Sequence, residues 1–176
     1  MKKLFAILLT VIMFSCSNKE TKTETPESTT SSSDLMKEEP TYDATKIDPN
    51  AKVVDITLNT EGNTMTDMKY DMKEIRVPAG STIHMKFNNK ATDAAMIHNF
   101  VIIEEGMADS VASNGIKAGP SAGYIPSSKD VLYGSKLLQP KESTEFSIPA
   151  PAKGSYDFIC TYPGHYKMMN GKLIVE

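Results

Sequence analysis

The stretch "GSYDFICTYPGHYKMMNGKLIVE", residues 154–176, holds two short apolar segments on either side of a turn. Residues 155–161 and 171–176 are rich in aromatic and β-branched side chains with a period near two, which predicts two strands. Between them, Pro163-Gly164 forces the chain to turn. One loop at the end of a strand is therefore expected to hold Cys160, His165 and Met169.

Similar segments continue upstream as far as residue 52, and Pro, Gly and Asn separate them. They are "KVVDITLN", "KEIRVPAGSTIHMKFNN", "IHNFVIIEE", "DVLYGSKLL" and "STEFSIPA". About seven short strands at close spacing predict an all-β Greek-key sandwich of antiparallel strands. Residues 104–130 lack this alternation, which indicates an insertion with a short helix over about residues 107–113, ending near Asn114-Gly115.

The first 16 residues have the layout of a secretory signal: two lysines, an apolar run and then Ser15-Cys16. The run is too short to span a bilayer. A small residue followed by cysteine resembles a bacterial lipobox, so Cys16 is predicted to carry a lipid. The alternative is ordinary cleavage at a nearby site. A lipid-anchored protein of the bacterial cell envelope, facing the periplasm or the exterior, is expected.

Residues 17–48 are rich in Ser, Thr and Glu, and residues 17–33 contain no apolar side chain. Such a segment cannot bury enough surface to offset its ordering entropy, so a disordered tether is predicted. The domain is expected over residues 49–176, which carry 13 basic and 14 acidic side chains. This near-neutral balance without a basic stripe argues against nucleic acid as a partner.

Cys160, His165 and Met169 offer a thiolate, an imidazole and a thioether. A copper ion that changes oxidation state favours this soft set when a second imidazole joins it, whereas a thioether is a poor zinc ligand. The second imidazole must come from His84 or His98. His84 alternates with apolar neighbours in a predicted strand and so points to solvent, which favours His98.

From about residue 52 to its end, the sequence resembles the azurins of the cupredoxin family, small blue copper proteins. The resemblance rests on His98-Asn99, on "CTYPGH" at residues 160–165 and on Met169, with weaker support from "DITLN" and the final "GKLIVE". It implies a cupredoxin-like Greek-key β-sandwich with a short helical insertion. It also implies one copper ion that alternates between Cu(I) and Cu(II).

The resemblance implies that His98, Cys160 and His165 are strong ligands and that Met169, rather than the adjacent Met168, is the weak axial ligand. The backbone N–H groups of Asn99 and Tyr162 would donate to the Cys160 sulfur, and the Asn99 side chain would tie the two ligand loops together through Thr161. A partner docking patch is expected around a partly exposed His165 ring. Its members would be Met96, Ile116, Tyr162, Pro163 and Met168.

Two positions depart from the azurin pattern. Ile97 stands where azurins place a glycine whose carbonyl approaches copper, and a branched residue there favours a four-coordinate site. Azurins also carry a structural disulfide, whereas residues 49–176 contain only Cys160.

The function implied is that of a one-electron carrier, not an enzyme. The expected partners are c-type cytochromes or a copper-dependent reductase or oxidase, and the protein is expected to be a monomer. Copper storage or delivery could use the same ligands and stays an alternative. A copper oxidase or nitrite reductase would need a second metal centre, for which the sequence has no spare histidine cluster. A metal-free adhesion sandwich is the remaining alternative.

Overall fold

The computed structural model describes residues 46–176. The predicted signal segment, its Cys16 and residues 17–45 of the predicted tether lie outside the described residues. Within residues 46–176, no helix is both long enough and apolar enough to cross a membrane.

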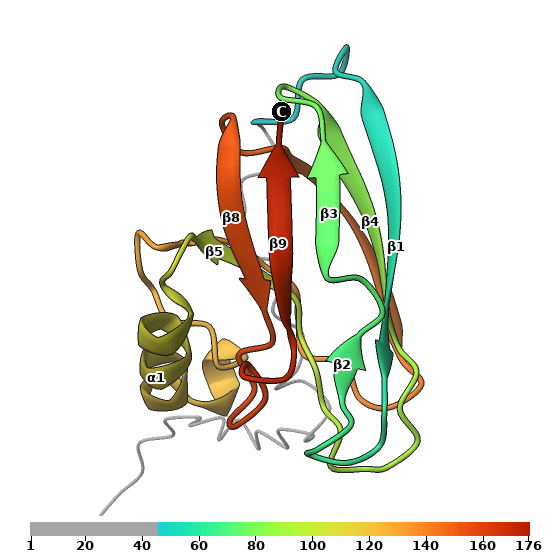
Figure 1. The fold of residues 1–176 in the computed structure, drawn as a ribbon, viewed down its shortest axis with the longest axis vertical. Helices are drawn as coiled ribbons and strands as arrows, with labels where there is room; N and C mark the ends of the chain where they lie inside the picture. Colours follow the sequence, from blue (N-terminus) through green and yellow to red (C-terminus); the bar gives the residue numbers. More distant parts are fainter. Residues whose placement is uncertain (1–45) are drawn as a thin grey trace, which may run out of the picture. The chain divides into compact units, whose positions relative to one another are not determined.

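Two sheets pack face to face (Figure 1). The four-stranded sheet has the order β2-β1-β4-β7, with strands β1 (Val53–Glu61), β2 (Lys69–Tyr70), β4 (Thr82–Asn89) and β7 (Ser143–Pro149). The five-stranded sheet has the order β3-β9-β8-β5-β6, with strands β3 (Glu74–Val77), β5 (Val101–Glu104), β6 (Val131–Gly134), β8 (Gly154–Ile159) and β9 (Asn170–Val175). The predicted β-sandwich with a short helical insertion is confirmed.

Two strand pairs are parallel, contrary to the antiparallel arrangement predicted from the sequence. β1 runs parallel to β4 from Val53 opposite Thr82 to Thr60 opposite Asn89, and β3 runs parallel to β9. The cause is the path of the chain between β2 and β3, which leaves the first sheet for the second before β4 returns beside β1. An alternating pattern gives the buried face of a strand but not its direction.

The core lies between the sheets and is aromatic at its centre. The Tyr70 ring makes edge contacts with Phe87, Phe100 and Phe158 at centroid distances of 6.2, 6.4 and 5.5 Å. Such pairs stabilise a core beyond the area that they bury. The same apolar cluster extends to Cys160, which directly follows β8, so this donor lies at the edge of the core.

A helix, α1 (Ala108–Ala118), covers the other face of the five-stranded sheet, where its Val111 packs against Val101, Ile103 and Ile159 (Figure 1). The predicted helix is confirmed, but its predicted end near Asn114-Gly115 is wrong. Gly115 lies inside α1, where a Cβ would collide with the backbone carbonyl of Tyr124. Gly115 therefore permits a close approach of two backbone segments. The helix ends at Ala118 and is followed by Gly119, whose φ is +79°.

Candidate metal centre

Three buried donors converge at one end of the sandwich. The Nδ1 atoms of His98 and His165 lie 3.2 Å apart, and the Cys160 Sγ lies 3.9 Å and 3.8 Å from them. All three side chains are at most 1% exposed. Among residues 46–176, they form the one group of three or more His, Cys, Asp or Glu residues placed to hold a metal ion.

Main-chain hydrogen bonds fix the position of each donor. The backbone of His98, just before β5, exchanges two hydrogen bonds with Leu138, at 3.1 and 2.7 Å. Cys160 directly follows β8, and its N–H donates to the carbonyl of Met169 at 3.0 Å. The N–H of His165 donates to the Tyr162 carbonyl at 3.0 Å. The donors are therefore held by the fold rather than gathered by a ligand.

The two methionines of the loop differ in exposure. The N–H groups of Met168 and Met169 both donate to the His165 carbonyl, at 3.0 and 2.9 Å, and so form a tight turn. Gly164 enters this turn with a φ of +84°, a backbone conformation that favours glycine. Met169 is fully buried beside Cys160 in the core cluster, whereas Met168 is 40% exposed. Of the two methionines, only Met169 is therefore buried with Cys160.

The sulfur of Cys160 accepts hydrogen bonds from the backbone N–H groups of Asn99 and Tyr162. The Asn99 side chain also joins the two ligand segments. Its Oδ1 accepts from the Thr161 N–H at 2.8 Å, and its Nδ2 donates to the Thr161 Oγ1 at 2.8 Å and to the Gly123 carbonyl at 3.0 Å. Asn99 therefore holds the His98 segment, the Cys160 loop and the residues after α1 together.

Tyr70 is a neighbour of this network that the sequence does not single out. Its hydroxyl donates to the Asn99 carbonyl at 2.6 Å. Nothing in "DMKYDMK" distinguishes a buried tyrosine from a surface one, because β2 has only two residues and shows no usable period. The role of Gly123 could not be predicted either, because it accepts the hydrogen bond through its backbone carbonyl, a group that every residue has.

Burial sets the protonation of the donors. It raises the pKa of the Cys160 thiol to about 12, although the two N–H groups that point at the sulfur act in the opposite direction. It lowers the pKa of His98 to about 3, with a contribution from His165, and the pKa of His165 to about 4. Both imidazoles are therefore neutral near pH 7 and keep a lone pair for a metal ion.

The donor set fits copper. One thiol and two neutral imidazoles converge without a carboxylate, which matches the soft and borderline ligands that copper prefers. The His98 Nε2 is buried and has no hydrogen-bond partner within the described part of the chain. An unpaired buried nitrogen costs free energy. The other ring nitrogen, His98 Nδ1, faces the cluster and is the one that could bind a metal ion.

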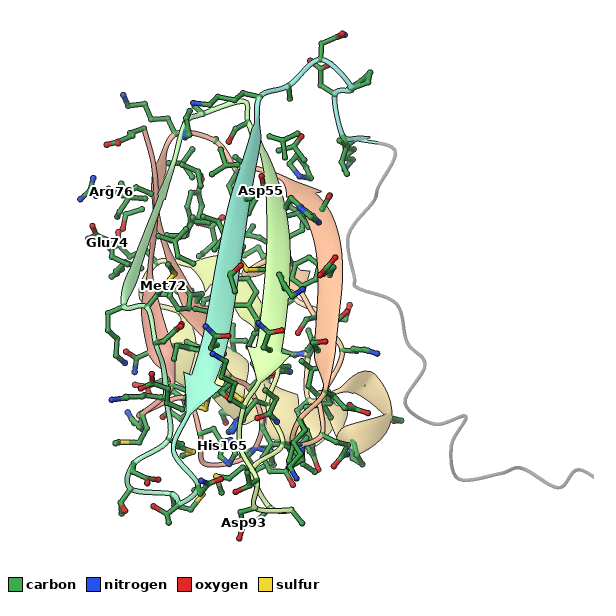
Figure 2. All side chains as sticks on the ribbon, turned by 90° about the vertical axis from the view of Figure 1, so that its right-hand side faces the viewer. Asp55, Met72, Glu74, Arg76, Asp93 and His165 are labelled. Carbon is green, nitrogen blue, oxygen red and sulfur yellow. The ribbon has the colours of Figure 1, made fainter. Side chains whose placement is uncertain are left out.

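His84 lies apart from the cluster. Its side chain is 40% exposed on β4, and its Nδ1 lies 2.7 Å from the Asp55 carboxylate. Figure 2 shows Asp55 well separated along the sandwich from the end that carries His165. The structure therefore brings His98, and not His84, next to Cys160 and His165.

The expected docking patch needs two corrections. Met96 is only 3% exposed, because its side chain packs in the core and its carbonyl accepts a hydrogen bond from the Asn89 side chain at 2.8 Å. His165 is buried too, and its ring lies 4.8 Å from that of Tyr162. The Tyr162 ring in turn meets Tyr124 edge-on at 5.3 Å. The remaining predicted members, Ile116, Pro163 and Met168, are exposed or half-buried.

Comparisons with known proteins agree with this chemistry. Residues 54–176 match the family model described as copper binding proteins, plastocyanin/azurin family. The chain is 37% identical over 126 residues to Auracyanin-A of Chloroflexus aurantiacus, covering 70% of this chain and 75% of that protein. It is 32% identical over 127 residues to Azurin iso-2 of Methylomonas sp. strain J, covering 68% and 96%.

A relative from Neisseria gonorrhoeae is named Outer membrane protein H.8 and is 33% identical over 113 residues, with 61% of each chain covered. Among solved structures, auracyanin A of Chloroflexus aurantiacus, described as a "blue" copper protein, superposes with a TM-score of 0.63 at 35% identity. That match covers 70% of this chain and 99% of the other.

Proposed function

Because the chain belongs to the plastocyanin/azurin family of copper-binding proteins, we propose that it carries one electron at a time between redox partners in the cell envelope. The observation that supports this proposal best is the buried cluster of His98, Cys160 and His165. These side chains are at most 1% exposed, which leaves a substrate no access to the cluster. Electron transfer needs no such access, whereas catalysis at the metal does.

In this proposal His98 and His165 would hold copper through their Nδ1 atoms, Cys160 would hold it through its sulfur, and Met169 would be a weaker fourth ligand through its thioether. Bound copper would supply a one-electron change between Cu(I) and Cu(II). The protein holds the donors by backbone hydrogen bonds, so their positions need not change with the charge of the site. The N–H groups of Asn99 and Tyr162 withdraw electron density from the sulfur and help to set the reduction potential.

We propose that the route to a partner runs over Tyr162, and the burial of His165 supports this. The half-buried Tyr162 ring lies between those of His165 and Tyr124. We propose that Tyr162, together with Pro163, Met168 and Ile116, forms the surface on which a partner docks. A c-type cytochrome or a copper-dependent reductase or oxidase fits a one-electron carrier.

An anchor at Cys16 and a tether over residues 17–48 would keep the carrier, as a monomer, at a membrane. The signal-like first 16 residues support this, as does the outer-membrane name of one relative. The mass of the mature chain tests the proposal: a Cys16 without a lipid would contradict it.

The full-length protein loaded with copper is expected to be blue and to be reduced and reoxidised reversibly, with one electron taken up per chain. It should do so even in the presence of a chelator. Buried donors held by the fold release the ion slowly, whereas a storage or delivery protein needs exchangeable metal. Spectroelectrochemistry with and without the chelator makes the measurement. Rapid loss of colour to the chelator would favour storage or delivery, and a protein that stays colourless with Cu(II) would refute the copper site.

Met169→Leu is expected to keep the blue colour and raise the reduction potential, because Cu(II) depends on a fourth donor more than Cu(I) does and leucine removes that donor. We expect at least a threefold change in the one-electron equilibrium, which corresponds to about 30 mV. Voltammetry of the variant checks this. Met168→Leu is the matched control and should behave as the wild type, since Met168 is exposed. If the two variants exchanged behaviour, the axial assignment would be wrong.

A further inference from the structure

Tyr70 places a hydroxyl inside an aromatic core. It is 1% exposed, and its ring meets Phe87, Phe100 and Phe158 edge-on. Burial raises its pKa well above the usual value, so the hydroxyl keeps its proton and remains a donor. A hydroxyl buried in such surroundings without a hydrogen bond destabilises the fold. The Asn99 carbonyl, 2.6 Å away, is therefore essential to the placement of this side chain.

Asn99 connects Tyr70 to the metal centre. Its N–H donates to the Cys160 sulfur, and within residues 46–176 its carbonyl receives a hydrogen bond from Tyr70. These two groups belong to the planar peptide units on either side of one Cα. A rotation about that Cα would therefore change the direction of the N–H relative to the carbonyl. The side-chain amide of Asn99 is fixed separately by Thr161.

We propose that Tyr70 is a positioning residue for the copper centre, one that holds the Asn99 backbone so that its N–H stays directed at the Cys160 sulfur. This inference rests on the proposed function. A hydrogen bond to a ligating sulfur stabilises the state in which that sulfur carries more negative charge, which is the reduced state. Tyr70 thus raises the reduction potential without touching the metal.

The test is Tyr70→Phe in the full-length protein loaded with copper. Phenylalanine keeps the ring and its edge contacts and removes only the hydroxyl. The expected result is a protein that still binds copper and is still blue, with a lowered reduction potential and a shifted charge-transfer band. Voltammetry and absorption spectroscopy give the two readouts, neither of which depends on transfer to a partner.

Tyr156→Phe is the matched control. Tyr156 is also a buried tyrosine whose hydroxyl donates to a backbone carbonyl, that of Ala152 at 2.8 Å. It lies in β8, four residues before Cys160, and its hydroxyl bonds the turn that precedes that strand. Its removal is expected to lower stability as Tyr70→Phe does while the potential and the band stay unchanged.

If Tyr70→Phe lost stability while its reduction potential and charge-transfer band matched the wild type, Tyr70 would be a core residue only and the proposal would be overturned. The same would follow if Tyr156→Phe shifted the potential and the band equally. Should the phenylalanine variant not fold, 3-fluorotyrosine at position 70 offers a stronger donor in nearly the same volume. A raised reduction potential would then support the proposal, and an unchanged potential would refute it. A wild-type protein that fails to turn blue would instead refute the proposed function itself.

Discussion

Cys160→Ser is expected to abolish the blue colour of the protein loaded with copper. The colour of such a centre arises from charge transfer between a thiolate and Cu(II), and a serine hydroxyl is a hard donor that stays protonated at neutral pH. Copper affinity should fall by more than the roughly 10–100-fold that is typical when a residue supporting a metal ligand is lost. Absorption spectroscopy and a copper titration with a competing chelator measure the two effects.

Met168→Ser is a suitable control for this experiment. It introduces the same side chain eight residues away, in the same loop, at a position that is 40% exposed. It should keep both the colour and the affinity. A Cys160→Ser protein that remained blue would remove this cysteine from the site, and equal losses in both variants would point to damage of the loop instead.

Asn99→Ala is expected to lower the free energy of unfolding of the copper-free protein by about 2–4 kcal/mol. The change removes three side-chain hydrogen bonds, two to Thr161 and one to Gly123, and leaves the buried Thr161 N–H without its acceptor. An unsatisfied buried donor destabilises a protein more than a typical hydrogen bond stabilises it. Urea unfolding without copper measures the loss separately from any effect on metal binding.

Asn88→Ala provides the comparison. Asn88 is half-buried on β4, and its amide donates to the Asn59 side chain at 2.9 Å. Its loss should lower the free energy of unfolding by no more than about 0.5 kcal/mol, as is usual at a surface position. Similar losses in the two variants would show that the hydrogen bonds of Asn99 stabilise the fold no more than a hydrogen bond at a half-buried position does.

Local spacing in the sequence was enough to predict the donors of the C-terminal loop. Cys160 and His165 are five residues apart across a Pro-Gly turn, so their approach is a local property of the chain. His98 was predicted by a weaker argument. His84, the other candidate, alternates with apolar residues in its own strand and was therefore expected to face solvent. The approach of His98 to Cys160 spans 62 residues, and only tertiary structure brings them together.

What the sequence could not predict depends on packing between distant segments. Met96 and the His165 ring were expected at the surface but are buried, because Tyr162 and the core cover positions that have no burial pattern of their own. The parallel pairing of β1 with β4 depends on where the chain changes sheets. Tyr70 became visible as a candidate only through its hydrogen bond to Asn99.

The 62-residue separation between His98 and Cys160 has a consequence for stability. In the described part of the chain Cys160 is a free thiol, so no disulfide restrains the unfolded ensemble there. A metal ion shared by the two segments would act as a removable cross-link. A covalent link closing a loop of that size stabilises a fold by about 4 kcal/mol in the chain-entropy model. Copper binding and the free energy of unfolding are therefore thermodynamically linked. The bound ion would stabilise the fold as a cross-link in addition to changing its oxidation state.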